Sequence, residues 1–194
     1  MPGMKRMLWL LLTFVLVGCS IFAVKNSRAN TESPAYRVVR SDGDFELREY
    51  PALRLAKTGM ASDMDGSFMR LFGYITGKNE RSESISMTTP VLIDRKQGAG
   101  SMSFIVPQAT LEKGVPQPKS EQVRIDDLAA GQFAVHRFKG TSKGKNEAAA
   151  LSALRDWCSK QKLTTQGEPL FAYYDPPWTP AFLCRNEVLL RVKP

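Results

Sequence analysis

Residues 36–60 read YRVVRSDGDFELREYPALRLAKTGM, and their side chains alternate in the manner of β-strands. The alternation runs from Tyr36 to a turn signal, Ser-Asp-Gly-Asp at 41–44, and resumes at Phe45. Two alternating runs joined by a short turn are typical of a β-hairpin, and proline marks an edge or a break in a strand. We therefore expect a hairpin here, broken at Pro51.

An amphipathic helix is expected next, within residues 62–77, SDMDGSFMRLFGYITG. Ser62 with Asp65 resembles a capping box, and Gly77 stands where a C-terminal glycine cap belongs. Two strands should follow at 85–94 and 101–107. The apolar stripe of this helix has helical spacing and consists of Met64, Phe68, Leu71, Phe72 and Ile75.

The second half of the chain repeats this order of elements after a proline-containing connector. A hairpin is expected over 121–140, and a helix over 146–161 with Asn146 as its N-cap. Strands at 168–177 and 186–194 close the chain. Leu151, Leu154, Trp157 and Cys158 form the apolar face of this second helix. The duplication predicts an α+β domain with hairpin-helix-strand-strand halves related by a pseudo-twofold axis.

The N-terminal region has the pattern of a secretory signal. Lys5 and Arg6 precede a short apolar run that ends at Leu-Val-Gly-Cys, which resembles a bacterial lipobox. We therefore interpret residues 1–18 as a lipoprotein signal peptide, Cys19 as the lipidated residue and 19–35 as a polar tether. Cleavage elsewhere and an uncleaved signal anchor are the alternatives. Ser20 favours an envelope location, at an outer membrane and facing the periplasm.

The basic charge favours a solvated surface over a nucleic-acid site. Removal of residues 1–18 deletes two basic residues and lowers the net charge from +8 to +6. The remaining cations are scattered and form no basic stripe, so no nucleic-acid partner is expected. Cys158 and Cys184 remain, and the sequence leaves open whether they form a disulfide or stay as free thiols.

Several motifs, in one order, resemble the SOUL haem-binding protein family. They are FELREYP (45–51), GYITGKN (73–79) with ISMTTPV (85–91), FAVHRFKG (133–140), and YYDPPWTP (173–180) with RNEV (185–188). The resemblance covers most of residues 36–194, which we expect to form the haem-binding domain. It implies a distorted antiparallel β-barrel flanked by two helices, and tetrapyrrole binding in an apolar groove.

The resemblance also implies which residues line the groove. Phe68 and Phe72, one helical turn apart, stand with Tyr174 and Trp178 where relatives place groove-lining side chains. Relatives usually have basic residues near the haem propionates, and Arg70 and Lys78 are the substitutes this chain offers. A porphyrin is a flat apolar plate with two carboxylates at one edge, which suits aromatic walls and a cationic rim. The alternative for the phenylalanines is ordinary packing of the helix on the sheet.

His136 is the single histidine of the chain and a candidate iron ligand. The alternative is a histidine of the core or the sheet edge, and Met69, Met87 and the tyrosines are other candidates. Arg185, Asn186 and Glu187 are better explained as a polar network at a strand entrance than as catalytic groups.

The sequence thus predicts a non-enzymatic, monomeric, membrane-tethered carrier or buffer of haem or another tetrapyrrole. It has no nucleophile motif and no metal-ligand spacing of the C-x-x-C or H-E-x-x-H type. A binding module for other small apolar ligands, of the effector-sensor kind, is the alternative function.

Overall fold

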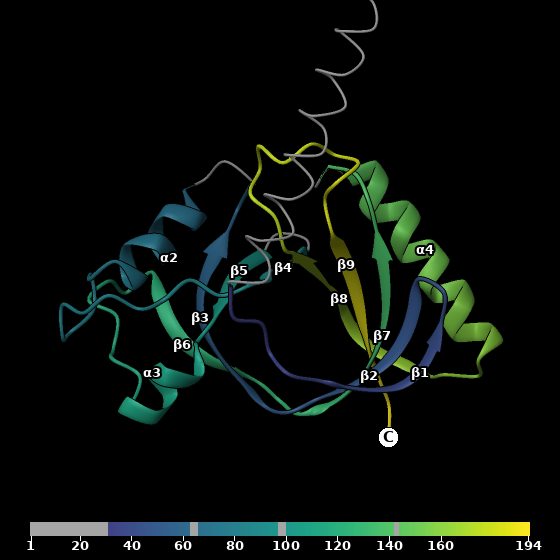
Figure 1. The fold of residues 1–194 in the computed structure, drawn as a ribbon, viewed down its shortest axis with the longest axis horizontal. Helices are drawn as coiled ribbons and strands as arrows, with labels where there is room; N and C mark the ends of the chain where they lie inside the picture. The colour runs from purple at the N-terminus through teal and green to yellow at the C-terminus, as the bar shows by residue number, and fades with distance from the viewer. Residues whose placement is uncertain (1–30, 63–65, 97–99, 142–143) are drawn as a thin grey trace, which may run out of the picture.

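One antiparallel sheet of nine strands forms the centre of the described residues 31–62, 66–96, 100–141 and 144–194, in a computed structural model (Figure 1). The signal peptide, Cys19 and Asp65 lie outside these residues. The strands are β1 (Arg37–Asp42), β2 (Phe45–Tyr50), β3 (Leu53–Met60), β4 (Val91–Asp94), β5 (Gly100–Ile105), β6 (Val123–Leu128), β7 (Gly131–Phe138), β8 (Thr165–Tyr173) and β9 (Asn186–Val192). The described helices are α2 (Ser67–Ile75), α3 (Gln108–Lys113) and α4 (Gly144–Lys160).

The strand order makes the duplication visible. The order is β1-β2-β7-β9-β8-β4-β5-β3-β6. It reads the same from both ends once β1 is set aside, because β2-β7-β9-β8 corresponds to β6-β3-β5-β4. The two halves meet where β4 pairs with β8.

The hairpin β1–β2 is confirmed, with Gly43 at its turn in the left-handed region (φ 60°). The hairpin expected over 121–140 is wrong. β6 pairs with β3, and β7 pairs with β2 and β9. β2 of the first half therefore joins the strands of the second half, and β6 of the second half joins those of the first, an exchange that alternation within a strand does not reveal.

The sheet is not closed into the barrel that we expected. β1 and β6 stand at its two ends, and no ladder joins them among the described residues. The sheet instead curls, so that its halves face each other across a concave inner surface (Figure 1). Apolar side chains from both halves fill this surface, namely Tyr50, Leu55, Leu92, Ile105, Phe133, Val135, Ala172, Tyr174 and Leu189.

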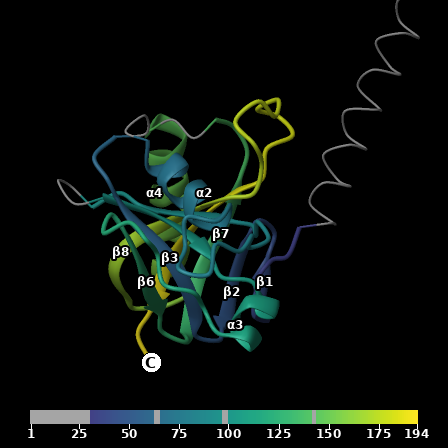
Figure 2. The same ribbon diagram turned by 90° about the vertical axis from the view of Figure 1, so that its left-hand side faces the viewer.

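The two longer helices cover the convex side of the sheet, α2 on one half and α4 on the other (Figures 1 and 2). The predicted face of α4 is confirmed, since Leu154, Trp157 and Cys158 are buried and Leu151 packs against the same cluster. Asn146 is not an N-cap, because α4 already begins at Gly144.

Helix α2 begins later than expected. Gly66 is its N-cap, with a left-handed backbone (φ 80°), so Ser62 does not cap it. Gly77 adopts φ 115° just after the helix, as expected of a C-terminal glycine. The short helix α3 was not predicted.

Two further sequence questions are answered by packing. Cys158 and Cys184 are not joined in a disulfide; the first faces the core under α4 and the second lies before β9. Residues 31–35, which we assigned to the tether, contact the domain. Glu32 accepts hydrogen bonds from the Thr89 N–H with its carbonyl and from the Gln108 N–H with its carboxylate, both at 2.8 Å.

Candidate functional site

An apolar groove of about 530 Å³ lies between α2, the segment before β4 and the loop from Tyr174 to Arg185, which we call the β8–β9 loop. This volume is within the range of small-molecule sites. The groove is lined by Thr31, Phe68, Phe72, Met87, Thr89, Val91, Tyr173, Tyr174, Asp175, Pro176, Pro177 and Trp178.

Helix α2 forms one wall of the groove because some of its apolar side chains are buried against the sheet and others stay exposed. Leu71 and Tyr74 are fully buried against the sheet. Phe68 and Phe72 remain 42% and 40% exposed, with their rings stacked at a centroid distance of 6.0 Å and an angle of 14°. Phe68 also contacts Phe104 edge-on at 5.3 Å, which fixes its ring. The two stacked rings therefore form an aromatic wall of the groove that packs against Phe104.

The β8–β9 loop forms the opposite wall and is pinned at its base. The Asp175 carboxylate accepts a hydrogen bond from the Arg185 N–H at 2.7 Å, and the Tyr174 N–H donates to the Arg185 carbonyl at 3.3 Å. Pro176 and Pro177 restrict the backbone that follows. Trp178 projects beyond them and is 82% exposed.

A buried ion network lies behind this loop, as the sequence indicated for residues 185–187. Glu187 is fully buried, and its carboxylate accepts hydrogen bonds from Arg48 at 2.8 and 3.1 Å and from Arg185 at 2.7 and 3.1 Å. The Tyr174 hydroxyl donates to the same carboxylate at 2.9 Å. Arg48 is also fully buried and was missed by the sequence reasoning; the signal was an arginine on the inward face of FELREYP.

The ion pairs with Arg48 and Arg185 determine the protonation state of Glu187. Burial acts to raise the pKa of Glu187, but the hydrogen bonds and charges of Arg48 and Arg185 outweigh it and hold the pKa below its usual range. Burial raises the pKa of Tyr174, and the Glu187 charge adds to the rise. The glutamate is therefore ionised and the tyrosine neutral at physiological pH.

A second polar cluster holds Tyr173, which lines the groove. The Tyr173 hydroxyl donates to the carboxylate of Glu147 on α4, and Arg95 forms an ion pair with that carboxylate at 2.6 Å. Burial, followed by the bond to Glu147, raises the pKa of Tyr173. The cluster ties α4 to β8 and fixes the ring that faces the groove.

The groove brings together Phe68, Phe72, Tyr174 and Trp178, but not Arg70 or His136. The Arg70 guanidinium donates to the Thr58 hydroxyl at 3.0 Å and to the Gly59 carbonyl at 2.7 Å, and so lies against β3.

His136 stacks on Phe45 at a ring distance of 4.2 Å. Its Nδ1 lies 3.1 Å from the Ala150 carbonyl under α4. The core alternative that we weighed for this histidine therefore describes its packing.

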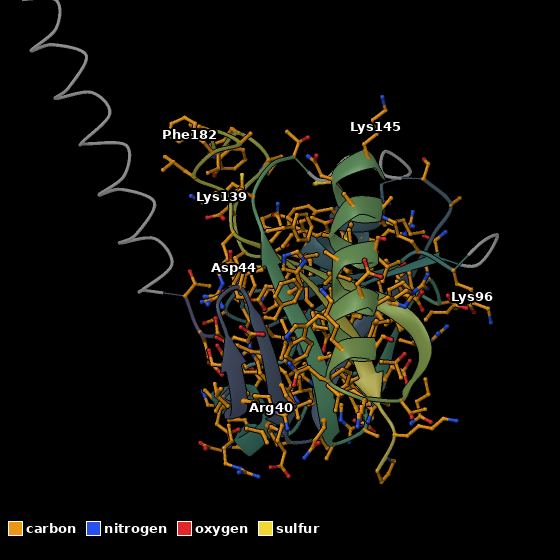
Figure 3. All side chains as sticks on the ribbon, turned by 90° about the vertical axis from the view of Figure 1, so that its right-hand side faces the viewer. Arg40, Asp44, Lys96, Lys139, Lys145 and Phe182 are labelled. Carbon is orange, nitrogen blue, oxygen red and sulfur yellow. The ribbon has the colours of Figure 1, made fainter. Side chains whose placement is uncertain are left out.

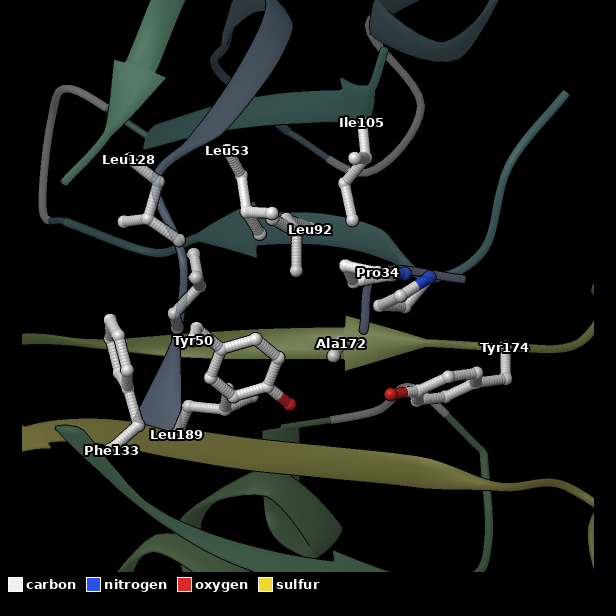
Figure 4. A pocket seen from close by; sticks show the side chains of 12 residues that line it. Pro34, Tyr50, Leu53, Leu92, Ile105, Leu128, Phe133, Ala172, Tyr174 and Leu189 are labelled. Atoms are coloured by element: carbon white, nitrogen blue, oxygen red, sulfur yellow. The ribbon is translucent and has the colours of Figure 1, made fainter. Parts of the chain in front are cut away.

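The inner surface of the sheet offers a smaller and a larger space. Tyr50 and Tyr174 border a small apolar cavity of about 20 Å³, enough for one water molecule (Figure 4). A groove of about 570 Å³ adjoins it, with a charged rim that includes Lys57, Asp127 and Arg191. Arg191 donates to two backbone carbonyls and Lys57 pairs with Asp126, so these two cations are engaged within the domain, and Lys96 is the third cation of the lining.

The aromatic groove fits the faces of a porphyrin better than its carboxylate edge. Five of its twelve described lining residues are aromatic. No lysine or arginine is among them, and Asp175 is the single charged residue. Tyr173, Tyr174 and Met87 are the lining residues of types that ligate haem iron. The propionates of a bound haem would have to point toward solvent.

Neither a metal-binding cluster nor a membrane-spanning helix is found among the described residues. No group of three or more His, Cys, Asp or Glu is placed among them to hold a metal ion. None of the helices found in these residues is long and apolar enough to cross a membrane.

Comparison with solved structures identifies the fold. The C-terminal domain of EcmrR superposes with a TM-score of 0.58 and 13% identity, covering 81% of this chain and 98% of that one. A hydrolase from Listeria innocua gives a TM-score of 0.56 and 9% identity, covering 80% and 94%. Similarity at such low identity shows a shared fold alone.

Sequence comparison identifies the family. Heme-binding protein 2 of Mus musculus and that of Homo sapiens are each 30% identical to this chain over 124 residues, which is 58% of the chain. The chain spans about 60% of the length of these curated relatives. The family model described as SOUL heme-binding protein matches residues 31–191. The chain therefore belongs to the SOUL heme-binding protein family.

Proposed function

We propose that this domain binds haem or a related tetrapyrrole in the groove between α2 and the β8–β9 loop, as a carrier or buffer rather than an enzyme. One observation carries the proposal: Phe68 and Phe72 on α2 face the same apolar groove as Tyr174 and Trp178, more than 100 residues later in the chain. Membership of a haem-binding family supports the choice of ligand.

Each wall has a defined part in this proposal. The stacked rings of Phe68 and Phe72 offer a flat apolar surface to one face of the plate. Trp178 and the prolines before it bound the other side. Burial of apolar area supplies the affinity, and the polar edge of the ligand stays in water because the described lining offers no cation.

Haemin titration of the full chain, followed at the Soret band, tests the proposal. The parent chain should bind one equivalent with saturation, and Phe72→Asp should weaken binding by about 10- to 100-fold, the energy of one buried aromatic side chain. Leu111→Asp is the matched control, since Leu111 is 38% exposed on α3 and Phe72 is 40% exposed. Equal affinity of the two variants would contradict the proposed site, and no saturable binding would contradict haem as the ligand.

The part played by iron and by the propionates is tested with altered ligands. We expect His136→Ala to bind haemin like the parent chain, because His136 does not line the groove. The dimethyl ester of protoporphyrin should bind at least as tightly as the free acid. A strong preference for the free acid would show that a cation of the protein contacts the propionates. The proposal that the propionate edge of the ligand faces solvent would then be wrong.

We also propose that the domain is tethered to the cell envelope through Cys19, at an outer membrane and facing the periplasm. Support comes from the basic residues, apolar run and lipobox-like ending of residues 1–19. Metabolic labelling with a fatty acid tests this. Label should enter the parent chain and be lost in Cys19→Ser.

Binding of other small apolar ligands remains the second candidate function. The observation that favours it is the lining itself, which is aromatic and has a carboxylate as its single described charge. Such a groove also suits a neutral or cationic aromatic molecule. Competition decides between the two functions: a flat aromatic cation that displaces haemin and binds more tightly would favour the second.

A further inference from the structure

Exposed apolar side chains gather at the end of the domain where the groove opens. Nine large apolar side chains are exposed among the described residues, and five of them belong to α2 and the β8–β9 loop. Trp178 is 82% exposed, Met69 63% and Phe182 61%. Single exposed apolar residues are ordinary, but a cluster of this kind marks an interaction surface.

Two exposed lysines stand beside this cluster. The Gly140 N–H donates to the Ala181 carbonyl at 3.0 Å, which places Lys139 next to the loop segment that carries Phe182. Lys145 lies in the first turn of α4, and the adjacent Asn146 side chain donates to the Thr141 carbonyl at 3.2 Å. Figure 3 shows Phe182, Lys139 and Lys145 at the same end of the molecule.

The chain also enters the domain at this end. Thr31, the first described residue, lines the groove together with Trp178. The apolar run of the N-terminal region ends at Val17, 14 residues before Thr31. A segment of that length spans at most about 50 Å when extended. If the apolar run or a lipid on Cys19 enters a bilayer, the groove end stays within that distance of the surface.

We infer that the groove end of the domain docks on an anionic phospholipid bilayer. Trp178 and Phe182 enter the boundary between headgroups and acyl chains, where exposed aromatic residues at the tip of a loop are stable. Lys139 and Lys145 meet the anionic headgroups. The groove then opens at the lipid surface, so an apolar ligand passes between bilayer and protein without crossing water. This holds whether or not the ligand is haem.

Trp178 itself provides the local signal for a test on the full chain. The difference in emission between the parent chain and Trp178→Phe isolates Trp178 from Trp9 and Trp157. On vesicles of phosphatidylcholine with phosphatidylglycerol, this difference emission should shift to shorter wavelength. Lipids brominated on the acyl chain should quench it. The buried Trp157, seen as the loss of emission in Trp157→Phe, should not be quenched.

Two further variants make the result specific. Phe182→Ser should reduce the quenching of Trp178 and leave haemin affinity unchanged, since Phe182 does not line the groove. In Lys139→Gln/Lys145→Gln, quenching should fall to the level seen on vesicles of phosphatidylcholine alone, because two lysines near the surface favour binding about 30-fold. Far-UV circular dichroism checks that each variant is folded.

Several outcomes would overturn the inference. Vesicle-bound protein with an unshifted, unquenched Trp178 would mean that the N-terminal region alone holds the chain. A Trp178 emission already shifted before vesicles are added would mean that the chain's own N-terminal region occupies the surface, or a second copy if the shift depends on protein concentration. Equal quenching on anionic and zwitterionic vesicles would contradict the claim that anionic lipid is required. None of these results bears on haemin binding in solution, so the two proposals fail independently.

Discussion

At the scale of single residues, the buried carboxylate of Glu187 is the centre of the hydrogen-bond network behind the site. It holds Arg48, Arg185 and Tyr174 behind the β8–β9 loop. Removal of one partner from a buried ion pair leaves the other charge without compensation, at a cost of about 3–5 kcal/mol.

Glu187→Gln should therefore lower the free energy of unfolding by several kcal/mol, because the fully buried Arg48 loses one of its two carboxylate partners and keeps only Glu46. Urea unfolding at pH 7 measures the change. Glu49→Gln is the control, since the Glu49–Arg37 pair is exposed to solvent, and it should cost no more than about 1 kcal/mol. Equal effects of the two substitutions would contradict the role assigned to the buried pair.

The same carboxylate predicts a pH dependence. Because the pKa of Glu187 is lowered in the folded state, its contribution is fully present above the unfolded pKa of about 4.3. It is lost as the pH falls below that value and through the folded pKa. The parent chain should lose stability below about pH 4.3, and Glu187→Gln should show a flatter profile over the same range. Parallel profiles in urea unfolding would show that other groups control the acid limb.

The sequence predicted correctly the groove-lining residues whose positions follow from a local pattern. Phe68 and Phe72 are one turn apart, so helical spacing places them on one side of the predicted apolar stripe, and the structure shows that this side stays partly exposed. The same reasoning failed for Arg70, whose long side chain turns back to β3, and it missed Arg48, whose partner Glu187 is 139 residues away. The direction of a long side chain and a distant charge partner are properties of the tertiary structure.

At the scale of elements, the β8–β9 loop is expected to control affinity more than stability. Asp175→Ala removes the hydrogen bond that the Arg185 N–H makes to the loop, while the network of Glu187 stays in place. Haemin binding should weaken several-fold, and the free energy of unfolding should fall by only about 1 kcal/mol.

Soret titration and urea unfolding on the same preparations measure both effects. Asp156→Ala, on the exposed face of α4, is the control and should change neither quantity. A large loss of stability with unchanged affinity in Asp175→Ala would show that the loop is a structural brace rather than a wall of the site.

The elements themselves were predictable in kind but not in pairing. Helical spacing identified α2 and α4, and alternation identified the hairpin β1–β2. The exchange of β2 and β6 between the halves was not predictable, because each strand fits several partners equally well by pattern alone. The start of α2 was misplaced for a local reason, since a left-handed glycine caps it without any side-chain signal.

At the scale of the whole molecule, the exchanged strands should make unfolding cooperative. β2 pairs with strands of the second half and β6 with a strand of the first, so neither half retains its full sheet if the other unfolds. Leu71→Ala under α2 and Leu154→Ala under α4 each create a cavity at a fully buried site and should cost about 2–5 kcal/mol.

Each substitution should shift the whole urea transition, with the same midpoint by far-UV circular dichroism and by the emission of Trp157 in the second half. Leu71→Ala is the informative variant, since it lies in the half without Trp157. An early transition seen by circular dichroism but not by Trp157 would show that the halves unfold separately.

The central claim is that a tetrapyrrole lies against α2 and the β8–β9 loop. The most direct test is a titration of the ¹⁵N-labelled full chain with zinc protoporphyrin, a diamagnetic ligand, followed by amide chemical shifts. We predict that shifts are concentrated in Ser67–Ile75 and in residues 173–185, while the amides of β7 around His136 stay unchanged. Shifts centred on β7 and α4, or on the inner surface of the sheet, would place the ligand elsewhere and contradict the account.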